Sequence, residues 1–503
     1  MLSLPTVPLL LAAYLGGAVS AQVTTDSHSA ASKACGLLKI ELPNLIAFPG
    51  SAQYGSDIAH WATSSVQNAT CSIEPQTSKD VATILGIVGR DDIRAPFAVK
   101  GGGHAYNLGH SSTSGVQISM AKFNALTHDP VANTVTIGTG LTWDQVYTLL
   151  EPLGIMVAGG RVPGVGIAGL SLGGGYSWKT DQFGLTVDTI VAHDIVLPSG
   201  KFVHVTNKTQ PDLFFALKGG LNNFGVVTAI TYESHPQTLV FAGSVAYAPN
   251  VTDQFNNAVA NFDLKNSDPK AQVIVTYASV FGQFSSSIDL FYDAPSVPPG
   301  VFDEFLSIPS VKSDVKTRKF TEFLSTTFGN GDLGIGPFKV AQNVIPVLKY
   351  TIPVLNQMVN QVTTLGASLT QKFNGSVVVV TCSAEPFTLP FAHSKGGAYP
   401  HPPSRQVTPG SPFIAVQATA DPTQEAILAN SVKQLSHAVQ ATAVQEGQSR
   451  WDDLLYPNYA IAGTPLTLMY GSNVPRLNQI AKNVDPRGVM QLTGGPKFGA
   501  GHT

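Results

Sequence analysis

The feature that most constrains this chain is a glycine-rich stretch, GVGIAGLSLGGGYSW, at residues 164–178. It satisfies two patterns: the G-x-G-x-x-G of a dinucleotide-binding turn, with Asp188 as the acidic residue downstream, and the G-x-S-x-G of a hydrolase elbow, with Ser171 as nucleophile. Both patterns need a strand before the glycines and a helix after them. The preceding residues 159–163, GGRVP, make a poor strand, and the triple glycine at 173–175 disfavours a helix, so neither interpretation fits well.

A backbone cradle explains the stretch better. Its glycines alternate with apolar residues, whereas a flexible linker would be polar. A second glycine cluster, KGGGHAY at 100–106, follows an expected strand, PFAVK, and precedes NLGHSSTSG, in which Ser111 and Ser112 are hydroxyl donors. Glycine lets main-chain N–H groups approach a large or anionic ligand closely. The two clusters therefore predict a site for a ligand such as a pyrophosphate.

Composition and the N-terminus predict an exported protein. The 503 residues are only 12% charged and carry a net charge of −3, which offers no basic field for nucleic acid. Residues 1–21 contain an apolar run that ends in small residues, typical of a signal peptide, and the run itself is shorter than the about 20 apolar residues of a membrane span. We expect a secreted protein without a membrane anchor. N-glycosylation sequons lie at Asn68, Asn207, Asn250 and Asn374.

The cysteines agree with an oxidising compartment. Of the three, we predict a disulfide between Cys35 and Cys71, which would tie the N-terminal segment to the first domain. Cys382 follows the apolar run SVVVVT and is expected to be a buried, inert thiol. The sequence contains no H-E-x-x-H, C-x-x-C or EF-hand pattern, so no metal site is expected.

The coarse pattern indicates an α+β protein with several segments. A signal peptide and an N-terminal segment precede a first domain of short strands and helices, and the next region has long alternating strands typical of an antiparallel sheet with helices. We expect a helix at 78–88 capped by Ser78, a helix from 143 capped by Thr142, and a hairpin at 191–205. The predicted boundaries are 1–21, 22–70, 71–236, 237–449 and 450–503.

Taken together, the motifs resemble a known family. The first domain is similar to the FAD domain of the p-cresol methylhydroxylase/vanillyl-alcohol oxidase type, and the C-terminal segment resembles that of berberine bridge enzyme-like oxidoreductases. The motifs that carry this resemblance are KGGGH at 100–104, VPGVGIAGLSLGGGYSW at 162–178, DQFGLTVDTIVAHDIVLPSG at 181–200, DLFFALKGGLNNFGVVT at 212–228, YPNYA at 456–460 and YGSNVPRLNQIAKNVDP at 470–486. The resemblance implies a two-subdomain FAD-binding domain and a substrate domain on an antiparallel sheet.

The same resemblance implies a set of cofactor-binding residues. His104 matches the histidine that bonds covalently to the flavin, and Val162 stands where many members have a second linking cysteine, so we expect FAD held by one covalent bond. The implied cofactor-binding residues are Gly101, Gly102, Gly103, His104, Ala105, Ser111, Gly160, Val162, Pro163, Val165, Gly166, Gly169, Gly173, Gly174, Gly225, Val226, Val227 and Asn458.

The implied reaction is hydride transfer from a substrate alcohol or amine carbon to the flavin while a base removes a proton. Tyr176 matches a family base, although it could equally pack on the flavin, and Asn458 and Tyr459 match positions that flank the flavin ring. Some relatives use a glutamate before a P-H motif; here that position is Gly396, which removes one base candidate. Val165 favours an oxidase that reacts with O2 to give H2O2.

Several alternatives stay open from the sequence. The substrate could belong to secondary metabolism or be a carbohydrate. The chain could instead be a secreted flavin-binding protein without turnover. A hydrolase acting through Ser171 is the remaining class, and the sequence does not reveal the oligomeric state.

Overall fold

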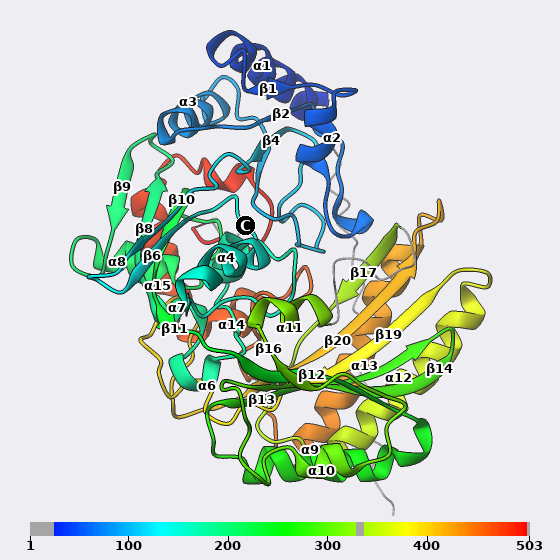
Figure 1. Cartoon of the computed structure of the whole chain (residues 1–503). Helices are drawn as coiled ribbons and strands as arrows, with labels where there is room; N and C mark the ends of the chain where they lie inside the picture. The colour runs from blue at the N-terminus through cyan, green and yellow to red at the C-terminus, as the bar shows by residue number, and fades with distance from the viewer. Residues whose placement is uncertain (1–24, 328–336, 500–503) are drawn as a thin grey trace, which may run out of the picture.

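The computed structural model describes residues 25–327 and 337–499. A large sheet forms the lower part of the molecule, and an α/β region that contains the N-terminal helix lies above it (Figure 1). The predicted signal peptide lies outside the described residues. Among the described residues, no helix combines the length and apolar character needed to cross a bilayer. The architecture is the α+β arrangement expected from the sequence, with a four-stranded, a five-stranded and a two-stranded sheet (β7, Ile155–Met156, with β11, His235–Pro236) in the first region and a large antiparallel sheet in the second.

The first small sheet has the order β1-β2-β4-β3, and its last three strands are parallel. Apolar side chains of helices α1 and α3 pack on it. Helix α3 begins where the sequence predicts, but its cap is Thr77 rather than Ser78. The Thr77 hydroxyl accepts from the Asp80 N–H, and the Asp80 carboxylate accepts from the Thr77 N–H, which makes a capping box. The elements are α1 (Thr25–Glu41), β1 (Ile46–Ala47), α2 (Ala52–Ile58), β2 (Cys71–Ile73), α3 (Ser78–Val88), β3 (Phe97–Lys100) and β4 (Val116–Ser119).

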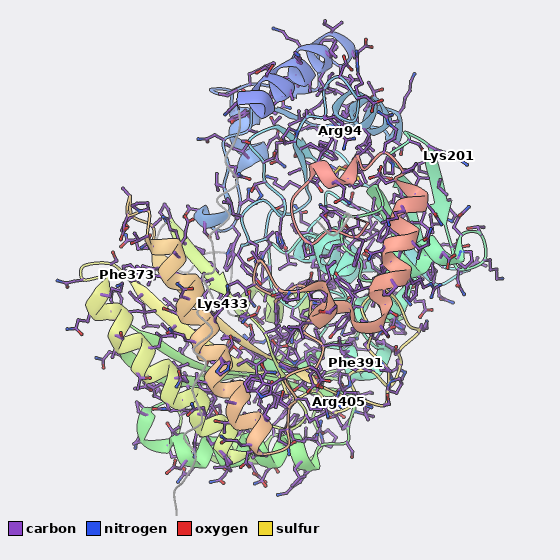
Figure 2. The ribbon with its side chains drawn as sticks, turned by 180° about the vertical axis from the view of Figure 1, so that it is seen from behind. Arg94, Lys201, Phe373, Phe391, Arg405 and Lys433 are labelled. Atoms are coloured by element: carbon purple, nitrogen blue, oxygen red, sulfur yellow. A yellow bond between two sulfur atoms is a disulfide. The ribbon has the colours of Figure 1, made fainter. Side chains whose placement is uncertain are left out.

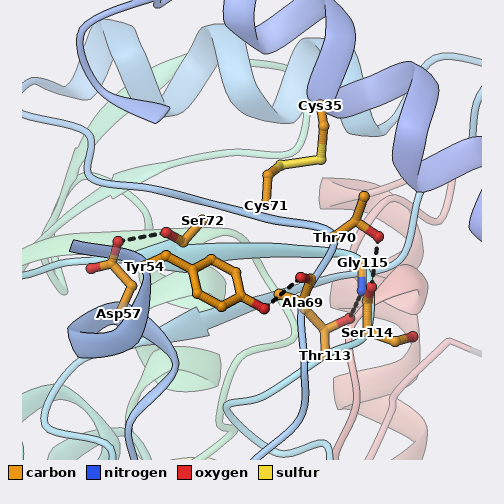
Figure 3. Close-up of a disulfide and its surroundings, with 10 residues drawn as sticks. All are labelled: Cys35, Tyr54, Asp57, Ala69, Thr70, Cys71, Ser72, Thr113, Ser114 and Gly115. Atoms are coloured by element: carbon orange, nitrogen blue, oxygen red, sulfur yellow. Dashed lines mark hydrogen bonds between the residues drawn. A yellow bond between two sulfur atoms is a disulfide. The ribbon is translucent and has the colours of Figure 1, made fainter. Parts of the chain in front are cut away.

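The predicted disulfide is present and joins α1 to the start of β2 (Figure 3). Near the disulfide, the Tyr54 hydroxyl donates a hydrogen bond to the Ala69 carbonyl at 2.7 Å. Cys382 is the free cysteine and is fully buried on strand β19 (Val378–Ala384), where burial raises the pKa of its thiol. Both cysteine predictions are therefore confirmed.

The second small sheet is antiparallel, in the order β5-β6-β10-β8-β9. Strands β8 and β9 form the predicted hairpin, and Thr142 is the N-cap of α4 as expected. The elements are β5 (Leu126–Asp129), β6 (Thr134–Gly138), α4 (Trp143–Leu150), β7 (Ile155–Met156), α5 (Ile167–Leu172), α6 (Thr180–Phe183), α7 (Thr186–Thr189), β8 (Ile190–Val196), β9 (Phe202–Val205), α8 (Pro211–Leu217), β10 (Val226–Glu233) and β11 (His235–Pro236).

The glycine-rich stretch matches neither the dinucleotide turn nor the elbow. Helix α5 lasts six residues and ends at Leu172, before the triple glycine. The Ser171 hydroxyl is fully buried and hydrogen-bonds the Tyr232 hydroxyl at 2.7 Å, so it is inaccessible to a substrate. Asp188 accepts from the Leu185 N–H and from His401, which is a structural role.

The large sheet places one face toward the first region and the other under helices. Its main order is β15-β12-β14-β13-β19-β20-β17, with β16 beside β12 and β18 beside β20. Helices α9, α12 and α13 cover the far face, and Figure 2 shows α12 and α13 from that side, with Lys433 pointing from α13. The elements are β12 (Val240–Tyr247), α9 (Thr252–Lys265), β13 (Ala271–Val280), β14 (Gln283–Tyr292), α10 (Asp303–Ser307), β15 (Lys312–Ser313), β16 (Lys316–Arg318), α11 (Phe320–Thr326), β17 (Phe338–Gln342), β18 (Ile345–Val347), α12 (Ile352–Lys372), β20 (Thr408–Gln417) and α13 (Gln424–Gln445).

After α13 the chain returns to the first region through α14 (Leu466–Tyr470) and α15 (Val474–Val484). Arg94 donates to the carbonyls of Arg487 and Gly488 at 2.8 and 2.9 Å, so the end of the chain is tied to the loop before β3 (Figure 2). The returning segment thereby contributes to the site described next.

Candidate active site

A cavity of about 430 Å³ lies between the first region, the large sheet and the returning C-terminal segment. Most of the residues proposed from the sequence lie on its wall. Those that line it are Gly101, Gly102, Gly103, His104, Ala105, Ser111, Val162, Val165, Gly166, Gly169, Tyr176, Gly225, Val226, Val227, Asn458 and Tyr459.

Gly160, Pro163, Gly173 and Gly174 do not line the cavity. A Cβ on Gly160 would lie 2.6 Å from a Trp143 ring carbon, and a Cβ on Gly173 would overlap the side-chain amide of Asn458. These glycines therefore allow close packing behind the cavity wall.

The two glycine clusters meet inside the cavity. A Cβ on Gly102 would lie 2.5 Å from the Gly166 nitrogen, and a Cβ on Gly166 would likewise meet the backbone of Gly102. Contacts this short are impossible for any other residue at either position. The loop after β3 and the loop before α5 therefore form one continuous backbone cradle, as the sequence predicts.

The His104 side chain extends from this cradle and packs on an aromatic residue. Its ring stacks on Trp61 with centroids 4.4 Å apart and planes 9° from parallel. Burial lowers the pKa of His104 to about 4, so the ring is neutral at physiological pH. Its Nε2 is enclosed without a hydrogen-bond partner among the described residues, and His104 lines the cavity.

These features fit a flavin dinucleotide. A neutral imidazole is nucleophilic, and a cradle without side chains admits a planar ring and a diphosphate. Two polar groups, Ser111 and Asn222, also line this half of the cavity.

A buried charged cluster occupies the half of the cavity next to the sheet. Arg161 precedes Val162 in the loop before α5, and Glu385 directly follows β19. Arg161 Nη2 lies 2.6 Å from Glu385 Oε2 and donates to the Tyr459 hydroxyl at 2.9 Å, and that hydroxyl donates to Glu385 Oε1 at 3.0 Å. The Arg161 and Glu385 side chains are 6% and 3% exposed, so the pair is almost dry.

The cluster retains free hydrogen-bonding capacity. Arg161 Nη1 has no hydrogen-bond partner among the residues that the structure describes. Both Arg161 and Glu385 line the cavity. Buried polar atoms are seldom left without partners, so Arg161 Nη1 indicates that a polar ligand completes the cluster.

The pKa values of two members of the cluster fix their charges. Burial and the neighbouring Glu385 carboxylate hold the pKa of Tyr459 well above its usual value, against the opposing effect of Arg161. Burial lowers the pKa of Arg161, but the attraction of Glu385 outweighs it, so the pKa of Arg161 ends above its ordinary value. Arg161 is therefore a cation and Tyr459 a neutral phenol.

Tyr176 lies beside the cluster but is poorly placed as a base. Its ring packs on Phe387 and on Tyr456, with centroids 4.8 and 4.9 Å away, and Arg161 lies over it at 5.8 Å. Burial raises the pKa of Tyr176 well above its usual value, and Arg161 offsets this only in part. Of the two roles left open by the sequence, the geometry favours packing.

Asn458 is held in place by backbone and phenol groups. Its amide donates to the Leu170 carbonyl and to the Tyr456 hydroxyl, each at 2.9 Å. The Tyr456 hydroxyl in turn accepts from the Gly175 N–H at 3.0 Å. The YPNYA segment is thereby locked against the second glycine stretch.

The face of the large sheet that borders the cavity is polar. On β13, Val273 and Val275 face the helices, whereas Ile274 and Thr276 face the cavity. The other sheet residues on this wall are Asp289, Gln342, Thr381, Ser383, Ser411 and Phe413.

Sequence reasoning missed Trp61, Arg161, Glu385 and Asp289. The sequence does contain a signal for Glu385, which is a single charge at the end of a strongly apolar strand. Burying such a charge is costly unless it is paired, so its position indicates a buried ion pair. Gly396, the position at which the sequence placed a missing base, has a φ of +70° and does not line the cavity. Glu385 supplies a carboxylate to the cavity wall from another position in the chain.

Comparison with known proteins agrees with the site. Residues 69–206 match the model of the FAD binding domain family. The chain is 29% identical over 453 residues to the FAD-dependent monooxygenase drtC of Aspergillus calidoustus, covering 86% of this chain and 83% of that protein.

Two solved structures share the fold. The xylooligosaccharide oxidase of Myceliophthora thermophila C1, in complex with xylobiose, superposes with a TM-score of 0.73 at 18% identity, covering 91% of this chain and 98% of that one. The glucooligosaccharide oxidase of Acremonium strictum, studied for its 6-S-cysteinyl, 8α-N1-histidyl FAD, superposes with a TM-score of 0.72 at 17% identity, covering 91% and 97%.

The fold and the site thus define an FAD-linked oxidoreductase. The chain carries an FAD binding domain and shares the fold of berberine bridge enzyme-like and vanillyl-alcohol oxidase-type flavoenzymes. The family resemblance that the sequence motifs indicate is therefore confirmed.

Proposed function

We propose that this protein is a secreted oxidase of secondary metabolism that removes hydride from an alcohol or amine carbon of a small organic substrate and passes the electrons to O2, giving H2O2. The observation that carries the proposal is the Arg161–Glu385–Tyr459 cluster, which faces the same cavity as the glycine cradle and His104. FAD, when bound, supplies the two-electron acceptor.

The cluster handles the proton that the substrate must lose. The Tyr459 hydroxyl points at Glu385, so its oxygen can take the substrate proton while its own proton moves to the Glu385 carboxylate. Arg161 donates to the same oxygen and holds it in place. The substrate O–H or N–H bond breaks as its C–H hydride leaves, and a C=O or C=N bond forms.

Two variants test the proton pathway with a substrate that bleaches the flavin. Glu385→Gln removes the final acceptor and should slow anaerobic bleaching about 10²–10⁴-fold, the range of a lost general base. Tyr459→Phe removes the oxygen that relays the proton and should slow bleaching by a comparable factor. Glu233→Gln, at a partly exposed surface pair with Lys395, serves as the control. Unchanged bleaching in Glu385→Gln would refute the assignment.

We propose that a single covalent bond joins His104 to the flavin. The neutral, partly unpartnered ring supports this, and so does the histidyl FAD of the Acremonium oxidase. Acid precipitation should leave yellow flavin in the pellet, and peptide mapping should locate it on His104. His110→Ala removes another cavity histidine and should keep the bond, whereas His104→Ala should lose it. Covalent flavin that survives in His104→Ala would contradict the proposal.

Oxygen reactivity can be tested without knowing the substrate. Holoprotein reduced photochemically under nitrogen is mixed with aerated buffer, and flavin reoxidation and H2O2 are measured. An oxidase should reoxidise within seconds and release one H2O2 per flavin. Reoxidation that requires an artificial acceptor would identify a dehydrogenase instead.

A carbohydrate oxidase is the second candidate, favoured by the hydroxyl-bearing sheet wall. Thr276 and Ser383 share a hydrogen bond at 3.0 Å, and Gln342 donates to Ser411 at 2.9 Å. A panel of xylobiose, cellobiose and substituted benzyl alcohols, scored by flavin bleaching, separates the two substrate classes. Bound flavin that no member of a broad panel reduces would favour a flavin-binding protein without turnover.

Secretion is supported by the surface position of all four sequons. Asn68, Asn207, Asn250 and Asn374 are exposed. Glycosidase treatment of the protein from culture medium should lower its mass, and its N-terminal residue should be Gln22. An unglycosylated protein retained in cells would overturn this part of the proposal.

A further inference from the structure

A second carboxyl on the cavity wall lies level with Glu385. Strand β14 carries Asp289, whose direct partner on β13 is Ile274. Val275 pairs with Ala384 on β19, so the next position brings Ile274 level with Glu385. Directly paired residues share one face of a sheet. Asp289, Ile274 and Glu385 therefore form one row across three strands, and all three line the cavity.

The two carboxyl positions are well separated in this row. Adjacent strands lie about 4.8 Å apart, so the backbones at Asp289 and Glu385 are about 10 Å apart, with an apolar isoleucine between them. A substrate lying across Ile274 would thus meet one carboxyl at each end.

The two carboxyls differ in their partners. Glu385 is paired with Arg161 and Tyr459, so its charge is balanced. Asp289 receives a hydrogen bond from Ser244, and among the described residues no cationic side chain pairs with it. Burial raises the pKa of Asp289 to about 6, so the carboxyl is still largely ionised at pH 7.5. The Ser244 hydroxyl fills one acceptor position of Asp289, and an ionised carboxylate with two oxygens can accept further hydrogen bonds.

We infer that Asp289 determines substrate specificity by accepting a hydrogen bond from a hydroxyl or protonated amine that the substrate carries one apolar spacer away from the carbon that is oxidised. This inference rests on the proposed function, because it assumes that the reacting carbon lies beside Tyr459 and Glu385. The substrate class is an alcohol or amine with a second, remote donor group.

The test uses four para-substituted benzyl alcohols that share a reacting group and an apolar ring. The remote substituent is aminomethyl, hydroxymethyl, methyl or carboxylate. Their dissociation constants for the holoprotein at pH 7.5 are measured from the change in the flavin spectrum before bleaching. The aminomethyl and hydroxymethyl compounds should bind at least tenfold more tightly than the methyl compound, and the carboxylate most weakly.

Variants then test whether Asp289 causes the tighter binding of compounds that carry a remote donor group. Asp289→Asn should remove the aminomethyl preference and keep part of the hydroxymethyl preference, and Asp289→Leu should abolish both. Ser287→Ala, on the same strand but not on the cavity wall, is the matched control and should behave like the native protein. Melting temperature and flavin content confirm that each variant is folded.

The outcomes separate this inference from the proposed function. Equal binding of the aminomethyl and methyl compounds to the native protein, a preference that persists in Asp289→Leu, or failure of all four to bind would overturn the role of Asp289. Bleaching of the flavin by any alcohol or sugar supports the oxidase independently of these results, because bleaching does not require Asp289.

Discussion

The buried pair of Arg161 and Glu385 gives the sharpest test of the site as a dry cavity. With 2.6 Å between the charged atoms and an effective dielectric constant of about 20, their attraction is about 6 kcal/mol. Removing both charges from water costs several kcal/mol for each ion. The pair as a whole thus adds little net stability, whereas either charge left alone is expensive.

A double-mutant cycle exposes this asymmetry. Arg161→Met and Glu385→Met should each lower the free energy of unfolding by about 3–5 kcal/mol, because each leaves one buried charge without its partner. The double variant should lose only about 1–3 kcal/mol, the cost of depriving the Tyr459 hydroxyl of its partners. The two changes are therefore coupled by at least about 3 kcal/mol.

Urea unfolding of the flavin-loaded proteins, followed by far-ultraviolet circular dichroism, measures the four values. Arg90→Met is the control, since Arg90 and Asp92 are 49% and 67% exposed and an ion pair this exposed contributes little to stability. Losses that simply add, or an Arg161→Met variant as stable as the native protein, would refute the reasoning. Either result would mean that water solvates the pair, and the proton pathway would lose its basis.

Four further expectations follow from particular contacts. Replacing Cys35 and Cys71 by serine should lower the free energy of unfolding by about 4 kcal/mol in the loop-entropy model for a separation of 36 residues, measured by urea midpoints. Gly102→Ala should cost at least about 1–3 kcal/mol and reduce flavin content, because its Cβ would strike the Gly166 backbone, whereas Gly86→Ala in α3 meets no atom within 4 Å and should not destabilise; equal behaviour would argue against the cradle. Cys382 should react with Ellman's reagent only after unfolding, since it is buried and its thiol pKa is raised; fast labelling of the native protein would place it at the surface. Because burial raises the pKa of Asp289 from 3.8 to about 6, the native state binds more protons than the unfolded state between those values, so stability should rise as pH falls from 6 to 4, and Asp289→Asn should reduce that rise by at most about 3 kcal/mol in pH-dependent urea midpoints; an unchanged pH profile would mean that Asp289 is solvated.

The backbone half of the site was readable from the sequence for a physical reason. A cradle built from main-chain atoms needs glycine at fixed points, and Gly102 and Gly166 are such points because their backbones touch. Local capping and turn chemistry likewise predicted α4 and the β8–β9 hairpin. The disulfide followed from three cysteines and an oxidising compartment.

The side-chain half was not readable, because its members are brought together only by tertiary structure. Arg161 and Glu385 are more than 200 positions apart, and in the sequence each is a single charge beside apolar residues. Trp61 lies in an irregular segment whose sequence does not reveal that it stacks on His104. The family motif before P-H predicts a glutamate base at the position that Gly396 occupies. Glu385 instead brings a carboxylate to the cavity from the end of a different strand.

This division between backbone and side chains also predicts where function can vary within one fold. The cradle restricts the cofactor through main-chain positions that tolerate no side chain. The sheet wall instead presents alternate side chains of β13, β14 and β19, and exchanging any of them changes the chemistry of the cavity without disturbing the opposite face, which packs on the helices. Asp289 is one such exchangeable position, since the Ser244 hydroxyl is the hydrogen-bond partner of its side chain among the residues that the structure describes. A fold that binds one cofactor can therefore take new substrates by substitutions at a few alternating positions of one sheet, and Asp289 is where this chain should be altered first to change its specificity.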